Sequence, residues 1–535
     1  MKQPKTNGDR HAEAARPSWY VTTAIPYVNA PPHIGFALEI VQTDVLARYH
    51  RAKGYDVRFQ TGSDENSLKN VQAAARAGVP VADLVAANAR AFAVLTDVLD
   101  LSVDDFIRTS ADPRHGPGVA RLWTACADRG DIYRRAYRGL YCVGCEQFYK
   151  PDDLQDGRCP EHGTAPETVA EENYFFRLSR YRDALADRIG SGRLKIVPDT
   201  RRNEVLRWIA DGLEDFSISR SSGRARGWGL PVPGDPAQVI YVWFDALGNY
   251  VTALGYGSDD AAFGRYWRDA AERVHVIGKG ITRFHALYWP AMLLSAGLPL
   301  PDRILVHGYV TVDGAKIGKS ADNAIDPVPI ARDVGADALR YYLLRHVRST
   351  ADGDFARERL DRAYESELAD QLGNLARRTL SMVARYCDGV VPGLDDSDGI
   401  ARPLLDPMER LPGLVARHIE CFALHEAMTA IWDLVAAANK AIADQAPWDL
   451  AKQSRLAEEP AVAHRADARL RVCLHDLVAA LHVIGGCLGP FLPTTSSRLL
   501  RHIGAAGSNA RGFGDARPDV TGRRIEPGIM LFPKR

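Results

Sequence analysis

The chain has 535 residues, of which 67 are basic and 67 acidic. This length implies several domains, and the balanced charge excludes a protein that attracts nucleic acid over its whole surface. Residues 1–17 are polar and lack the apolar segment of a signal peptide, and no later run is apolar for long enough to span a bilayer. We therefore expect a cytoplasmic protein with a disordered tail over 1–17.

Strand and helix signals alternate along the first 125 residues. The stretch 18–24 is rich in aromatic and β-branched residues and predicts a strand. The stretch 36–54 then predicts a helix that ends at Gly54, and 55–67 predicts a second strand that ends in a polar loop. This βαβ order predicts a parallel sheet with right-handed crossovers. The apolar helix face is formed by Leu38, Val41, Val45 and Tyr49.

Two further strands, 273–280 and 302–314, each run into a glycine-containing loop. They lie far from the first pair, so the sheet is expected to be assembled from two halves with an insertion between them. Further on, 424–445 carries Leu424, Met428, Ile431 and Val435 at helical spacing, which predicts an amphipathic helix of a bundle.

These patterns predict an α/β protein in which a Rossmann-type parallel-sheet domain is followed by an α-helical bundle. The predicted segments are a tail, the first half of the sheet domain, an insertion, the second half of the sheet domain, a linker domain and the helical domain, over 1–17, 18–125, 126–225, 226–325, 326–360 and 361–535.

The insertion contains a candidate metal site. Cys142 and Cys145 are followed by Cys159 and His162, so two pairs with the same spacing can supply four ligands to one zinc ion. Four protein ligands leave no open position, which favours a structural zinc knuckle over a catalytic site. The alternatives are a redox pair at Cys142 and Cys145, or unrelated thiols.

Two loops carry residues that suit a nucleotide. His33 and Gly35 lie where the first helix begins, where the helix dipole favours a phosphate. The stretch 315–320 adds Lys316, Lys319 and Ser320 after the last predicted strand. The alternatives are an ordinary strand-to-helix turn capped by His33 and a solvated surface loop.

Together, the two loops resemble the paired HIGH and KMSKS signatures of class I aminoacyl-tRNA synthetases. Other segments are similar to the methionyl-tRNA synthetase family, over roughly residues 18 to 530. The segments that carry this resemblance are TTAIPYVNAPPHIG, RRNEVLRWI, GLEDFSISR, YVWFDALGNY, HVIGKGITRFHALYWPAMLLSAG, GNLARR and QAPW.

The resemblance implies a methionine–tRNA ligase. Such an enzyme activates L-methionine with ATP and Mg²⁺ to methionyl-adenylate, and then transfers it to the 3′-terminal adenosine of tRNA(Met). The implied catalytic residues are His33, Lys316 and Lys319. The implied ATP-binding residues are His33, Gly35, Gly278, Lys319 and Ser320.

The resemblance also implies where methionine and the anticodon bind. Asp64 would hold the substrate ammonium, and aromatic faces would enclose the thioether. The implied methionine-binding residues are Ile25, Tyr27, Asp64, Trp243, Ala246, Tyr250 and His285. In the helical domain, Asn374, Arg378 and Trp448 would meet the CAU anticodon. Core packing is the alternative for Trp243, Tyr250 and Trp448, and a helix-surface pair is the alternative for Asn374 and Arg378. We expect a monomer, since little chain follows the bundle.

Three positions depart from the family pattern. Phe36 replaces the second histidine of HIGH, Gly318 lies within the lysine loop, and Gly280 stands where the family usually has an aspartate associated with the ATP ribose. Losing one phosphate-site donor could cost about 3 kcal/mol of transition-state stabilisation. The sequence therefore predicts that Phe36→His restores a donor and raises the rate. The alternative function is a catalytically weakened paralogue that acts as a tRNA-binding or regulatory protein.

Overall fold

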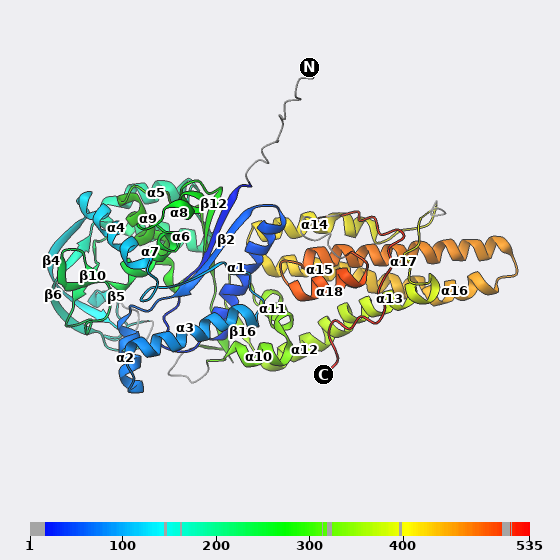
Figure 1. Cartoon of the computed structure of the whole chain (residues 1–535), viewed down its shortest axis with the longest axis horizontal. Helices are drawn as coiled ribbons and strands as arrows, with labels where there is room; N and C mark the ends of the chain where they lie inside the picture. Colours follow the sequence, from blue (N-terminus) through cyan, green and yellow to red (C-terminus); the bar gives the residue numbers. More distant parts are fainter. Residues whose placement is uncertain are drawn as a thin grey trace, which may run out of the picture.

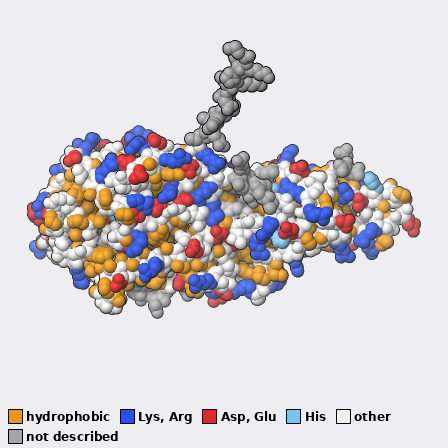
Figure 2. Space-filling model, in the orientation of Figure 1, with side chains coloured by type: hydrophobic (Ala, Val, Ile, Leu, Met, Phe, Trp, Pro, Cys, Tyr) orange, Lys and Arg blue, Asp and Glu red, His pale blue; other side chains and the backbone are white. Residues whose placement is uncertain are grey.

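The computed structural model describes residues 16–143, 147–160, 163–312, 314–317, 324–394, 399–505, 514 and 516–535. The tail predicted over 1–17 falls almost wholly outside these residues. The molecule is elongated, with an α/β body at one end and a helical arm at the other (Figure 1). Basic and acidic side chains are intermixed over the face shown in Figure 2, in keeping with the balanced charge.

A parallel sheet forms the centre of the body, in the order β3-β2-β1-β12-β13-β7. The adjacent central strands β1 and β12 come from the two predicted halves. The strand order reverses between them, and this is where an open α/β sheet binds its ligands. The strands are β1 Ser18–Thr23, β2 Asp56–Ser63, β3 Asp105–Arg108, β7 Lys195–Val197, β12 Glu272–Gly278 and β13 Arg303–His307.

The first helix, α1 (Ile34–Ala52), confirms the predicted helix, and Gly54 follows it with φ +90°. It is buried on nearly every side because it lies between strands β1 and β2 and helix α11. The other helical elements of the body are α2 Leu68–Ala77, α3 Val81–Val98, α4 His115–Asp128, α7 Val242–Thr252, α8 Ala261–Phe263, η3 Gly264–Arg268, η4 Lys279–Ile281, η5 Phe284–Tyr288 and α9 Trp289–Ser295.

Two small antiparallel sheets, β5-β4-β6-β8 and β10-β11-β9, form within residues 132–240, and strands β10 and β11 lie beyond the predicted end of the insertion at residue 225. Strand β7 lies within the predicted insertion but pairs with β13, so the insertion also adds an edge strand to the central sheet. The elements of this region are β4 Ile132–Cys142, β5 Gln147–Tyr149, η1 Pro151–Asp153, β6 Glu167–Phe176, η2 Leu178–Tyr181, α5 Arg182–Gly190, α6 Asp199–Asp211, β8 Phe216–Ser217, β9 Ser219–Ser221, β10 Pro231–Val232 and β11 Asp235–Ile240.

The stretch 302–314 was predicted as one strand but forms two, β13 and β14 (Val310–Val312). The break falls at Gly308, which packs so closely on the backbone of Ala351 and Asp352 that a Cβ there would overlap it. Strand β14 instead joins a small sheet of the linker region. The other elements of this region are β15 Ala315–Lys316, α10 Pro327–Val334, α11 Ala336–Arg345 and β16 Gly353–Phe355.

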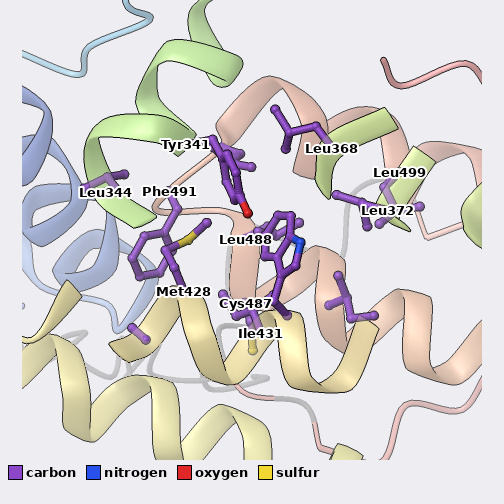
Figure 3. Packing of buried hydrophobic residues seen from close by; sticks show 14 of the residues in the cluster. Tyr341, Leu344, Leu368, Leu372, Met428, Ile431, Cys487, Leu488, Phe491 and Leu499 are labelled. Atoms are coloured by element: carbon purple, nitrogen blue, oxygen red, sulfur yellow. The ribbon is translucent and has the colours of Figure 1, made fainter. Parts of the chain in front are cut away.

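Residues 357–502 are mainly helical and confirm the predicted bundle. The predicted face of α15 packs into the core, where Met428 and Ile431 lie close to Leu488 and Phe491 (Figure 3). Helix α17 is long and apolar enough to cross a membrane, but its most apolar window is 89% buried within the protein. The bundle consists of α12 Arg357–Ala363, η6 Tyr364–Gly373, α13 Asn374–Tyr386, α14 Leu405–Glu420, α15 Leu424–Gln445, α16 Pro447–Leu456, α17 Pro460–Leu488 and α18 Pro493–His502.

A buried arginine joins the body to the arm. Arg340 of α11 is fully buried and pairs with Asp44 of α1 at 2.8 Å. Its guanidinium also donates to the carbonyls of Pro490 and Phe491, just before α18. A buried charge needs this degree of pairing, so the bundle is fixed directly to the helix that begins at His33.

Candidate active site

The connection from β1 to α1 places His33 at the helix N-terminus. His33 is exposed, and its Nδ1 accepts a hydrogen bond from the Gly35 N–H at 3.1 Å. A Cβ on Gly35 would lie 3.0 Å from the His33 ring, so glycine allows this close packing. A phosphate arriving here would meet the imidazole and the helix dipole first. The N–H of Gly35 would become available only when His33 moves.

The segment that follows the lysine loop is bound to the same helix end. The Ile34 N–H donates to the Ile325 carbonyl at 2.9 Å. Lys319, Ser320 and Gly318 lie outside the described residues. The backbone of Lys316 pairs with Thr311 in the β14–β15 hairpin, but the position of its side chain is not among the described features.

Gly278 ends β12 beside a buried hydrogen-bonded pair that the sequence did not reveal. Glu39 of α1 and His307 of β13 are joined at 2.7 Å, and Glu39 also accepts from the Ala24 N–H at 2.9 Å. A Cβ on Gly278 would lie 3.5 Å from the His307 ring. The pair therefore ties the ends of β1 and β13 to α1. Two signals could have pointed to it, a carboxylate on an apolar helix and a histidine that ends a strand.

Three of the predicted methionine-binding residues share one helix face. Trp243, Ala246 and Tyr250 all lie on α7 and are buried. The segment YVWF is rich in aromatic and β-branched residues, which are typical of a strand, but β11 ends at Ile240 and the following residues begin a helix with Asp245 in its first turn. The spacing of the three residues is helical, and this could have been recognised from the sequence.

Aromatic rings form the wall of this region. Trp243 stacks on Phe284 at 3.6 Å between ring centroids and meets Tyr27 edge-on at 6.4 Å. The Nε1 of Trp243 is buried and has no hydrogen-bond partner among the described residues. Phe284 was not predicted. It lies next to His285 in the π-helix η5, and single π-helical turns frequently mark functional sites.

Hydrogen bonding fixes the tautomer of His285. Its Nδ1 lies 3.0 Å from the Ile281 carbonyl, which can only accept, so Nδ1 carries the proton. Its Nε2 therefore accepts from the Tyr250 hydroxyl at 2.7 Å. Burial lowers the pKa of His285 to about 4 and holds the pKa of neighbouring His275 well below its usual range. Both histidines are therefore uncharged at neutral pH.

Asp64 follows β2 and is 3% exposed. It forms a parallel β-bridge with Tyr27, and its N–H donates to the Pro26 carbonyl at 2.9 Å. Ile25 lies half-buried on the same β1–α1 connection. The ends of β1 and β2 thus bring Tyr27 and Asp64 together beside Trp243.

A buried polar network supports this wall from behind. The Asp245 carboxylate accepts from the Asn66 amide at 2.7 Å and pairs with His115 at 2.5 Å, and His115 also bonds Thr252 at 2.8 Å. The network fixes α7 to the loop that carries Asp64. Sequence reasoning missed it because its members lie far apart along the chain.

The candidate metal site is described only in part. Cys142 and Cys159 are both buried, and Thr164 contacts both, through its hydroxyl at 3.9 Å from the Cys142 sulfur and its carbonyl to the Cys159 N–H. Cys145 and His162 lie outside the described residues, and the described residues alone contain no cluster of three metal ligands. The two buried thiols fit zinc, whose ligands are thiolates and imidazoles.

The helical arm carries a pocket at the predicted anticodon site. Arg378 of α13 and Trp448 of α16 lie 5.8 Å apart, guanidinium to ring centroid, and Trp448 is 43% exposed. They line a surface pocket of about 270 Å³ together with Arg377, Ser381 and Met382, which sequence reasoning did not select. Ser381 and Met382 lie three and four residues after Arg378, and this helical spacing could have indicated those two. Asn374 begins the same helix and accepts from Arg377 at 3.1 Å.

Comparison with known proteins agrees with this architecture. The family model for class I tRNA synthetases (M) matches residues 19–164 and 145–380. The methionine–tRNA ligase of Mycobacterium tuberculosis is 41% identical over 520 residues, which cover 96% of each chain. That of Brucella melitensis is 40% identical over 526 residues, which cover 97% of this chain and 98% of the relative.

Solved structures agree as well. Mycobacterium tuberculosis methionyl-tRNA synthetase in complex with methionyl-adenylate has a TM-score of 0.89 at 40% identity, covering 97% of this chain and 100% of that chain. The free form from the same organism has a TM-score of 0.83 at 38% identity, covering 98% and 99%. The chain therefore belongs to the methionine–tRNA ligase family of class I tRNA synthetases.

Proposed function

We propose that this chain activates L-methionine with ATP and transfers the methionyl group to tRNA(Met). One observation carries the proposal for the site. The switch point between β1 and β12 has a wall of aromatic rings and a buried carboxylate, Asp64, on one side. On the other side it has a helix N-terminus capped by an exposed histidine, His33. An amino acid and a nucleotide can therefore meet there.

In the first step, a methionine carboxylate oxygen attacks the α-phosphorus of ATP. The new P–O bond gives methionyl-adenylate, and the bond to the β-phosphate breaks to release pyrophosphate. His33 stabilises the charge that develops on the phosphoryl oxygens, together with Lys316 and Lys319. Gly35, Gly278 and Ser320 line the nucleotide. Mg²⁺ accompanies the ATP and supplies further charge stabilisation.

Methionine is chosen by an uncharged pocket. Asp64 binds the ammonium, while Trp243 and Tyr250 enclose the thioether with Ile25, Tyr27, Ala246 and His285. A thioether is only a weak acceptor, so contact with aromatic faces matters more than polar pairing. Because His285 stays neutral, as its low pKa requires, the pocket disfavours charged side chains.

In the second step, a hydroxyl of the 3′-terminal adenosine attacks the carbonyl carbon of the adenylate, and AMP leaves. The anticodon is bound at the far end of the molecule by Arg378, Trp448 and Asn374. An exposed tryptophan beside an arginine suits stacking of an unpaired base. One zinc ion would be held by Cys142, Cys145, Cys159 and His162, and it would stabilise the insertion. We place the enzyme in the cytoplasm as a monomer.

Methionine-dependent exchange of pyrophosphate into ATP tests the first step. We expect exchange with the wild type and a loss of at least a hundredfold in kcat/KM for methionine in Asp64→Asn, which removes the partner of the ammonium. Asp56→Asn at the opposite end of β2 is the matched control and should retain activity. A wild type that binds tRNA but shows no exchange would instead favour the weakened paralogue, to which Phe36 and Gly280 point.

A further inference from the structure

Tyr309 and Gly280 lie on two neighbouring loops at the carboxyl edge of the sheet. Gly280 is in the turn η4 after β12, and Tyr309 follows β13. The ends of these strands are paired, with Gly278 opposite His307. The Tyr309 hydroxyl lies so close to Gly280 that a Cβ on residue 280 would overlap it. Tyr309 therefore occupies the space that any larger residue at 280 would need.

The Tyr309 ring is held in this position. Its backbone N–H donates to Asp352 Oδ1 at 2.8 Å, and the Lys279 ammonium lies 4.4 Å from the ring centroid. Lys279 in turn pairs with Asp352 Oδ2 at 2.7 Å. The Asp352 carboxylate thus holds both the Tyr309 backbone and the Lys279 ammonium above the ring. Tyr309 itself is half-buried.

The chemistry of the hydroxyl indicates its ligand. A phenol is uncharged at neutral pH and both donates and accepts hydrogen bonds, as a sugar hydroxyl does. A phosphate would instead be drawn to the cations and to the helix end at His33. The nearest cation, Lys279, is already paired with Asp352.

We propose that the Tyr309 hydroxyl is the contact of this chain to the ribose hydroxyls of ATP, and that Gly280 is required because it leaves room for that hydroxyl. The inference rests on the proposed function. Tyr309 lies on the neighbouring loop. From there it makes the ribose contact that the family resemblance assigns to an aspartate at position 280. An aspartate at 280 would meet the Tyr309 hydroxyl and displace it.

The test compares Tyr309→Phe with the wild type, using ATP, 2′-deoxy-ATP and 3′-deoxy-ATP. Exchange kinetics give KM, and calorimetry gives the Kd of each nucleotide without turnover. We expect Tyr309→Phe to raise the KM and Kd of ATP about tenfold, the effect of one hydrogen bond. In Tyr309→Phe, the ratio of the Kd of one deoxy-nucleotide to the Kd of ATP should fall toward one. Tyr133→Phe, which loses a hydroxyl bonded to Asp215 in the insertion, is the matched control.

A second variant keeps the test informative if Tyr309→Phe is unstable. Gly280→Ala adds only the overlapping Cβ, so it should weaken ATP binding as Tyr309→Phe does, and the double variant should be no worse than either single one. Additive losses, or unchanged ATP affinity and ribose preference in Tyr309→Phe, would overturn the proposal. A wild type that binds ATP with these preferences but shows no exchange would contradict the proposed function alone.

Discussion

At the scale of single residues, the burial of Phe36 determines the role of this position in the HIGH-like motif. Its ring is 8% exposed and meets Phe92 of α3 edge-on at 5.1 Å, inside the main apolar cluster. The side chain therefore packs into the core, although the residue lies three positions after His33. A substitution at this position acts first on packing and only then on the phosphate site.

The structure thus reverses the expectation for Phe36→His. A histidine would bury a polar ring among apolar side chains, which costs about 1–3 kcal/mol when no partner is found. We expect a lower Tm and no gain in pyrophosphate exchange. Phe36→Leu, which keeps the site apolar, should lose less stability. Calorimetric scans and exchange rates, measured on the same variants, decide between a gain in rate and a loss of stability. A tenfold faster Phe36→His enzyme would show that the histidine reaches the phosphates.

At the scale of elements, local sequence patterns predicted α1, α15 and four strands of the central sheet, β1, β2, β12 and β13, but not its two edge strands, β3 and β7. These patterns were misleading at YVWF, where aromatic and β-branched residues begin the helix α7, and at 302–314, where the contact of Gly308 with Ala351 and Asp352 ends one strand and begins another. The break at Gly308 arises from a contact distant in sequence, whereas the helical spacing of Trp243, Ala246 and Tyr250 was visible locally. The Glu39–His307 pair and the Asp245 network were missed because they too depend on contacts distant in sequence.

The insertion gives a test at this scale. If Cys142, Cys145, Cys159 and His162 hold one zinc ion, metal analysis after dialysis should find about one zinc per chain, because thiolate sites bind zinc tightly. Cys159→Ser should lose the metal and lower the Tm. Cys421→Ser, which changes an exposed cysteine of the arm, should keep both. Full zinc in Cys159→Ser, or none in the wild type, would contradict the knuckle.

At the scale of the whole molecule, buried contacts join the α/β body to the helical arm. Helix α1 carries His33 at its N-terminus and Asp44 in its third turn, and Asp44 pairs with Arg340, which in turn holds the segment before α18. Patterns along the chain located the body and the arm separately. Their arrangement could not be predicted, because it depends on contacts between elements far apart in sequence: one apolar cluster that includes residues of α1, α11, α15 and α17, and the buried Arg340.

The pocket of Trp448, where we propose that the anticodon binds, lies on the arm, whereas the proposed adenylate site lies in the body (Figure 1). Trp448→Ala should therefore leave the exchange rate nearly unchanged. It should raise the KM for tRNA in aminoacylation roughly 5- to 150-fold, because stacking of one base contributes about 1–3 kcal/mol. Leu456→Ala, an exposed apolar residue of the same helix, is the matched control and should change neither the exchange rate nor the KM for tRNA.

If exchange fell as far as aminoacylation in Trp448→Ala, the tryptophan would be supporting the fold rather than a base. Loss of Arg378, whose guanidinium lies over the Trp448 ring, should then be compared in the same assay, where a selective rise in the KM for tRNA would place both residues at the anticodon.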